Sequence, residues 1–127
     1  MAMDTNKQRE TWPDLVDFIA KETGFSNKTK LSRQTTLNRD IGLDGDDADE
    51  FMAAYFKQFE VEYGNYDWSR YFGEEGFNPI GILIDVVRRK PALKPLTLGM
   101  LELAVTMGKW HTEILEQASL DLIRHPN

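Results

Sequence analysis

Apolar residues recur at helical spacing along most of the chain, and this pattern predicts an all-α protein. Leu15, Phe18 and Ile19 form the first apolar stripe, the face of a helix that packs on a core. Thr11 can cap this helix through its hydroxyl, and Gly24 is a natural stop because glycine tolerates the backbone of a helix end. We therefore expect the first helix to run from Thr11 to Gly24.

A second predicted helix has a wide aromatic face. Asp44 can cap its start, and Asp47 at its third position can accept hydrogen bonds from free backbone amides. Gly64-Asn65 is expected to end it. The apolar positions that fall on one face are Phe51, Met52, Tyr55, Phe56 and Phe59.

The segment between these two helices has the pattern of a long anchored loop. Residues 26–39 are rich in Ser, Thr, Asn and Lys, and Leu31 and Leu37 stand alone among them. Ile41 and Leu43 continue the same pattern. We expect the isolated leucines to hold the loop against the core.

Shorter segments complete the predicted bundle. Residues 73–79 indicate a loop, and the apolar run 80–87 fits either a short helix or a strand, with helix favoured. Thr97 can cap a further helix that Gly108 closes, and Thr112 can open a last helix. The apolar positions of that last helix are Ile114, Leu115, Ala118, Leu122 and Ile123. A short helix or turn is expected around the aromatic residues Tyr66, Trp68, Tyr71 and Phe72.

The composition fits one compact domain and argues against several kinds of chemistry. The 127 residues are 41% hydrophobic, enough for a single core. There is no cysteine, and His111 and His125 are too far apart to form a helical ligand pair, so we expect no disulfide, metal or cofactor. No segment has the length of a membrane span, and the polar start Met1 to Glu10 does not resemble a signal peptide. We expect a cytoplasmic protein.

The net charge of −6 is concentrated in one place. Nucleic-acid binding needs clustered Lys and Arg. The basic run Arg88 to Lys90 is short and fits a solvated connector, so no nucleic-acid partner is expected. Residues 38–50 hold Arg39 and the acids Asp40, Asp44, Asp46, Asp47, Asp49 and Glu50.

The run D-I-G-L-D-G-D-D resembles the attachment motif of the acyl carrier proteins, D-L-G-x-D-S-L. Gly45 stands where that family has the serine that bears phosphopantetheine, and Asp46 replaces the leucine that follows. The segment from Leu96 to Leu101 also resembles the T-x-G-x-L start of the last carrier helix. Because glycine has no hydroxyl, the resemblance implies the carrier fold without its cofactor. The matching positions are Asp40, Ile41, Gly42 and Asp44.

The chain resembles more closely a small bacterial family of uncharacterised, acyl carrier-like cytoplasmic proteins. This resemblance rests on G-L-D-G-D-D-A-D-E-F, on Tyr71 to Glu75, and on L-T-L-G-M-L-E-L-A with the trailing G-K-W. It implies an acyl carrier protein-like bundle of three to four main helices over residues 11–110. Residues 1–10 would be a flexible N-terminus, and residues 111–127 a C-terminal helical extension. Segment 73–95 is longer than its carrier counterpart.

Two serines lie in partial copies of the attachment motif. Ser119 stands in A-S-L-D, but too few residues follow it to build the rest of a carrier bundle. Ser69 lacks both the preceding aspartate and the following leucine. We expect neither serine to carry phosphopantetheine.

The acids at the start of the second helix exceed what capping requires. Asp44, Asp46 and Asp47 suit a first turn, where each contributes about 0.3–1 kcal/mol through the helix dipole. Asp49 and Glu50 lie beyond that turn, and Glu50 forms an i, i+4 like-charge pair with Asp46. The surplus is either an ordinary solvated face or a partner-docking face. The resemblance implies docking, because carrier proteins present the acidic face of this helix to basic patches on enzymes.

Other interpretations of these acids fail. An EF-hand alternates acids before a glycine, whereas Ala48 follows Asp44 and Asp46. Carboxylate catalysis needs an apolar pocket that raises one pKa, and an exposed helix end does not offer it. His111 beside Trp110 has no identified nucleophile, so no enzyme is expected.

Two functions therefore remain after sequence analysis. The first is a non-carrying interaction module that docks a basic protein surface, for example on an enzyme that recognises carriers. The second is a degenerate carrier that binds a lipid or a small apolar ligand in its helical core. That ligand would lie among Phe51, Tyr55 and Phe59.

Overall fold

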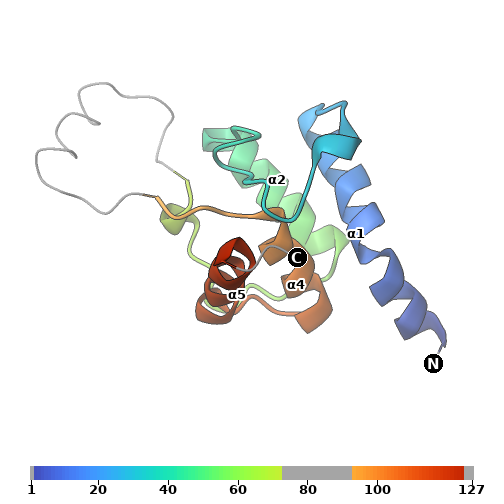
Figure 1. Cartoon of the computed structure of the whole chain (residues 1–127). Coiled ribbons are helices and arrows are strands. Elements are labelled where there is room, and N and C mark those ends of the chain that lie inside the picture. Colours follow the sequence, from blue (N-terminus) through green and yellow to red (C-terminus); the bar gives the residue numbers. More distant parts are fainter. Residues whose placement is uncertain (1, 73–92, 125–127) are drawn as a thin grey trace, which may run out of the picture.

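The computed structural model describes residues 2–72 and 93–124. Within them the chain is all-helical and has no strand, which confirms the expected small helical bundle (Figure 1). None of the helices in this described part has the length and apolarity needed to cross a membrane. The interpretations of residues 73–79 and 80–87 lie outside it. The elements in chain order are α1 (Ala2–Thr23), η1 (Lys28–Lys30), α2 (Gly45–Gln58), η2 (Trp68–Arg70), α4 (Leu98–Met107) and α5 (Thr112–Arg124).

Helix α1 begins at Ala2, well before the predicted start at Thr11. Residues 2–10 contain neither proline nor glycine, so nothing in their backbone chemistry stops a helix. Pro13 lies inside α1, where its missing amide removes one hydrogen bond without ending the helix. The helix stops just before Gly24, as predicted.

Helix α2 buries its aromatic face but ends earlier than predicted. It stops at Gln58 rather than at Gly64. Glu60 takes a left-handed backbone with φ of 56°, and Val61 turns inward to 5% exposure. The amide of Glu62 then donates to the carbonyl at the end of α4 over 3.0 Å, so pairing with a distant segment redirects the chain. The buried residues of α2 are Ala48, Phe51, Met52, Tyr55 and Phe56.

The loop between α1 and α2 is anchored to the segment that precedes α4. The amide of Leu37 donates to the carbonyl of Leu96 over 2.7 Å. The side-chain amide of Asn38 donates to the carbonyl oxygens of Tyr71 and Lys94 over 2.7 and 2.8 Å. These bonds fix a segment that has little regular structure of its own. Both leucines predicted as anchors are buried: Leu31 and Leu37.

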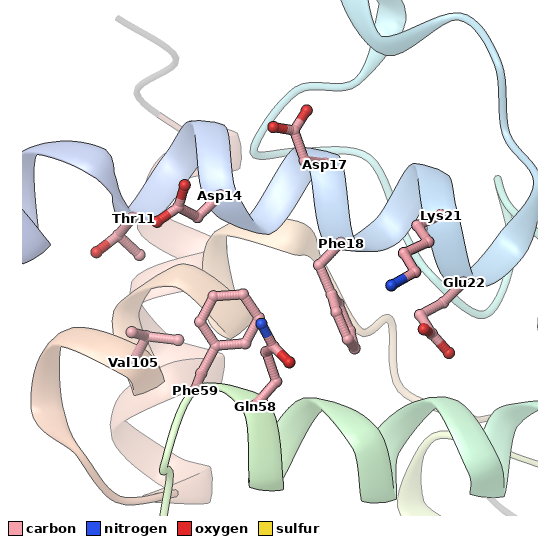
Figure 2. Close-up of a pocket in the computed structure, with 9 residues that line it drawn as sticks. All are labelled: Thr11, Asp14, Asp17, Phe18, Lys21, Glu22, Gln58, Phe59 and Val105. Atoms are coloured by element: carbon pink, nitrogen blue, oxygen red, sulfur yellow. The ribbon is translucent and has the colours of Figure 1, made fainter.

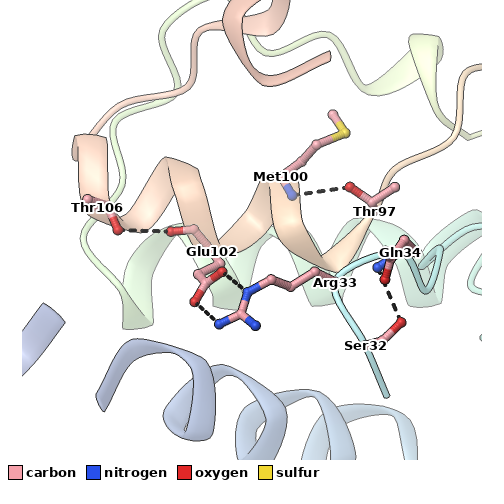
Figure 3. A network of polar contacts seen from close by, with 7 residues as sticks. All are labelled: Ser32, Arg33, Gln34, Thr97, Met100, Glu102 and Thr106. Atoms are coloured by element: carbon pink, nitrogen blue, oxygen red, sulfur yellow. Dashed lines mark hydrogen bonds and ion pairs between the residues drawn. The ribbon is translucent and has the colours of Figure 1, made fainter. Parts of the chain in front are cut away.

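Arg33 connects this loop to both α1 and α4 (Figure 3). Its Nε donates to Oε1 of Glu102 over 2.6 Å, and its Nη2 donates to Oε2 over 2.9 Å. The guanidinium carbon lies 4.5 Å from the ring centroid of Trp12, which is a cation–π contact. Because the ion pair is partly exposed, it contributes at most about 1 kcal/mol. Its main effect is to orient the loop.

The C-terminal helices begin where the sequence predicts, and α4 packs against both α1 and α5. The hydroxyl of Thr97 accepts a hydrogen bond from the amide of Met100 over 3.2 Å at the start of α4. Helix α5 begins at Thr112. One position differs from the predicted apolar face: Ile114 is 52% exposed, whereas its neighbour Leu115 is fully buried. Successive helical residues point about 100° apart, and in α5 Leu115 faces the core while Ile114 faces away from it.

Candidate functional site

Asp44 and Gly45 set the backbone conformation at the start of α2, where the predicted site lies. Asp44 is extended, with φ of −160° and ψ of 162°, and its carboxylate accepts from the Gly45 amide over 2.7 Å. Asp46 and Asp47 occupy the first turn, where the helix dipole favours carboxylates. The predicted amide contact of Asp47 is not formed with any described residue. Asp44 supplies the side-chain cap instead.

Gly45 has a left-handed backbone conformation, with φ of 56°. Glycine adopts it freely, whereas a side chain adds about 1–2 kcal/mol of strain. Position 45 therefore has no hydroxyl, and its backbone conformation disfavours serine.

Gly45→Ser is expected to add a hydroxyl without allowing cofactor attachment. The left-handed backbone strains the new side chain, and the residue that follows is Asp46, where the carrier motif that the sequence resembles has leucine. We expect a stability loss of about 1 kcal/mol and no added mass after incubation with coenzyme A and a phosphopantetheinyl transferase. Intact mass spectrometry makes the measurement, and Gly45→Ala is the control for strain. A phosphopantetheine adduct on the serine variant would contradict the prediction.

The two other candidate serines are engaged in local hydrogen bonds. Ser119 is 8% exposed, and its hydroxyl oxygen lies 3.3 Å from that of Thr97. Ser69 donates to the carboxylate of Asp67 over 2.7 Å at the start of η2. Ser119 is therefore shielded from a modifying enzyme, and Ser69 helps to form a turn.

The predicted site residues form one exposed patch at the start of α2, here called the acidic surface. Its members are Asp44, Asp46, Asp47, Asp49 and Glu50, all exposed. Among the described residues, none of them takes part in an ion pair. Three acids elsewhere are paired, namely Asp17 with Lys28, Glu102 with Arg33, and Glu116 with Arg70. The acidic surface therefore keeps its charge available to solvent or to a partner.

A polar network that no sequence motif indicates joins η2 and α5. Arg70 donates to both carboxylate oxygens of Glu116, over 2.7 Å from Nε and 2.6 Å from Nη2. The hydroxyl of Tyr71 donates to Glu116 over 2.8 Å. The bond from Arg70, followed by that from Tyr71, holds the pKa of Glu116 below its usual range. Burial raises the pKa of Tyr71. The partners are 46 residues apart in the sequence, so no local motif reveals them.

Tyr66 lies in the aromatic cluster with Phe56, Tyr71 and Trp110. Its hydroxyl is buried without a hydrogen-bond partner among the described residues, and so is the indole nitrogen of Trp68. Burial raises the pKa of Tyr66, and Tyr71, Asp49 and Asp67 add to the effect through their charges. The phenol therefore stays neutral at physiological pH. Asp49 is the member of the acidic surface that lies within electrostatic reach of this ring.

An open groove follows α1 on the side that faces the end of α2 (Figure 2). It has a volume of about 480 Å³. Its walls come from the stretch Thr11 to Glu22, from Gln58 and Phe59 at the end of α2, and from Val105 of α4. The groove and the acidic surface lie at opposite ends of α2. No sequence pattern predicts the groove, because its walls come from three helices.

Comparison with known families identifies the chain at the level of a family. The family described as "Protein of unknown function (DUF1493)" matches residues 4–113. The chain belongs to this family. No curated protein and no solved structure matches it.

The DUF1493 match covers the whole acidic surface and the whole groove. It begins at residue 4, ahead of the predicted domain start at Thr11, in agreement with the early start of α1. It ends at residue 113, so Glu116 and Ser119 lie beyond it. The expectation of an uncharacterised family is confirmed.

Proposed function

We propose that this protein is a non-carrying, acyl carrier protein-like interaction module that docks a basic protein surface through its acidic surface. The observation that carries the proposal is the clustering of five exposed acids at the start of one helix with no described cation paired to any of them. Asp17, Glu102 and Glu116 each have a Lys or Arg partner, whereas no member of the acidic surface pairs with a described cation. Contiguous unpaired carboxylates create a negative potential that steers and orients a basic partner.

The order of the structural parts supports the carrier-like half of the proposal. Helix α1, a long anchored loop and α2 follow one another, and α4 begins at the T-x-G-x-L motif. Gly45 opens α2 at the position of the carrier serine. Its missing hydroxyl and left-handed backbone both disfavour cofactor attachment.

The acidic surface is also held on a rigid support. Ala48 and Phe51 on the inner side of α2 are 0% and 2% exposed, and Tyr55 donates to the carbonyl of Leu101 over 2.7 Å. The carboxylates therefore project from a helix whose position is fixed by the core. A partner meets a preorganised pattern of charge, which lowers the entropic cost of docking.

The alternative of an apolar ligand in the core has less support. The ring centroids of Phe18 and Phe51 lie 5.2 Å apart, and those of Tyr55 and Phe59 lie 5.7 Å apart. These side chains pack on one another between α1 and α2. Contacts of this kind favour a filled interior.

Reversing two charges of the acidic surface tests the proposal. In Asp47→Lys/Glu50→Lys we expect the affinity for a partner captured from host cells to fall at least about tenfold, because attraction becomes repulsion. Immobilised protein with mass spectrometry identifies the partner, and titration at increasing salt measures the electrostatic share. The matched control is Glu113→Lys/Asp121→Lys, which makes the same charge change at exposed positions of α5. Unchanged capture by the first variant, or equal loss in both, would sink the proposal.

A further inference from the structure

The groove along α1 has carboxylates at both ends and aromatic rings between them. Asp14, Phe18 and Glu22 follow one another at i, i+4 spacing, so they form one stripe of α1 about 12 Å long. Figure 2 shows Phe18 projecting toward α2 between the two acids. The ring of Phe59 meets that of Phe18 edge to face, with centroids 5.4 Å apart. The order along the groove is therefore acid, aromatic, acid.

Among the residues that the structure describes, the unpaired charge of the groove is negative. Asp17 lines it too, but its carboxylate is paired with Lys28 over 3.0 Å. Lys21 is the cation within the walls, and among the described residues it has no ion-pair partner. Asp14 and Glu22 thus outnumber Lys21, and an occupant of complementary charge is cationic.

We infer that this groove docks a basic amphipathic helix of a partner protein. In a helix laid along α1, cations about two turns apart would meet Asp14 and Glu22. An apolar residue midway between them would meet Phe18 and Phe59. The volume of about 480 Å³ exceeds that of one side chain and suits several side chains from one helix face. A second copy of the chain is disfavoured, because each copy carries a net charge of −6.

This inference does not rest on the proposed function. The acidic surface opens α2, whereas the groove meets α2 at Gln58 and Phe59, where the helix ends. The two surfaces can therefore be reversed separately. A negative result for the groove does not decide whether the acidic surface docks a partner, and the reverse also holds.

The probe is a helical peptide with two arginines eight positions apart, a leucine midway, and alanine or glutamine elsewhere. We expect titration into the full-length, isotope-labelled protein to shift the amide resonances of Phe18, Lys21, Glu22 and Phe59. The resonances of Asp46 and Asp47 are expected to stay unchanged. The control peptide has glutamates in place of the arginines and is expected not to bind.

Lys21→Glu is expected to increase the affinity for the basic peptide. It converts repulsion into attraction at an exposed site, so the peptide is expected to bind about three to five times more tightly. Asp14→Lys/Glu22→Lys is expected to weaken binding at least about tenfold, while Asp46→Lys/Asp47→Lys leaves it unchanged. Fluorescence anisotropy measures each affinity. Resonance shifts at the acidic surface, no gain in Lys21→Glu, equal binding of the glutamate peptide, or a dimer that covers the groove would each overturn the inference.

Discussion

Gly64→Ala is expected to lower the free energy of unfolding by about 3 kcal/mol or more. Gly64 has φ of 55°, and a Cβ atom there would lie 2.0 Å from the carbonyl oxygen of Trp110 and 3.1 Å from its carbonyl carbon. The left-handed backbone costs an alanine about 1–2 kcal/mol. The overlap is with backbone rather than with a flexible side chain, so relieving it adds the cost of overpacking, about 1–3 kcal/mol. Urea unfolding followed by circular dichroism measures the loss.

The added Cβ atom would disturb the place where the segment after α2 is hydrogen-bonded to the segment after α4. The amide of Glu62 donates to the carbonyl of Gly108 over 3.0 Å, and the amide of Trp110 donates to the carbonyl of Glu62 over 2.9 Å. Trp110 itself is fully buried. Pushing Trp110 away from Gly64 would weaken both backbone bonds and disturb the packing of the indole.

Gly24→Ala is the matched control for this prediction. Gly24 also has a left-handed backbone, with φ of 75°, but a Cβ atom there would have no heavy atom within 4 Å. We expect it to cost only the backbone strain, about 1 kcal/mol. Equal destabilisation by the two variants would show that contact with Trp110 is not the cause.

The starts of α2 and α4 were predictable because capping is local. Asp44 and Thr97 each precede a helix and accept a hydrogen bond from a backbone amide of its first turn. The end of α2 was not predictable in the same way. Gly64 looks like a helix stop in the sequence, but Glu62 is already committed to a backbone bond with Gly108. Gly108 is distant in the sequence, and no local pattern around Glu62 predicts this bond.

The same distinction separates the acidic surface from the other sites. Its five acids lie within one turn or two of one helix, so the sequence alone brings them together. The groove needs α1, α2 and α4 to meet, and the polar network needs η2 to meet α5. Arg70 and Tyr71 are neighbours in the sequence, but Glu116 is an ordinary acid on an amphipathic helix until the helix is placed. Tertiary packing, rather than any motif, creates both sites.

Glu116→Ala is expected to lower the free energy of unfolding by about 2–4 kcal/mol. The hydroxyl of Tyr71, a fully buried residue, donates to Glu116 over 2.8 Å and loses its partner in the variant. An unpaired buried hydroxyl costs about 1–3 kcal/mol. Loss of the partly exposed pair with Arg70 adds at most about 1 kcal/mol. Chemical unfolding near pH 7 measures the difference.

The stabilisation by Glu116 is also expected to depend on pH. The pKa of Glu116 is lowered in the folded protein, mainly by the bond from Arg70. Its ionic contribution is therefore complete above the unfolded pKa of about 4.3 and is lost as the pH falls through the lower folded value. The stability difference between the native protein and Glu116→Gln should shrink below about pH 4. A difference that is constant from neutral to acidic pH would contradict this ionic role.

Double substitution separates the buried hydroxyl from the ion pair. In a Tyr71→Phe background there is no buried hydroxyl that can lose its hydrogen-bond partner. Glu116→Ala should then lower the free energy of unfolding by about 1 kcal/mol or less. Glu102→Ala is the matched comparison, because Glu102 accepts the same two bonds from Arg33 without a tyrosine hydroxyl. It too should cost about 1 kcal/mol or less. If Glu116→Ala cost the same with and without the Tyr71 hydroxyl, the stability would come from Arg70 instead. The network would then be a surface ion pair rather than a means of burying Tyr71.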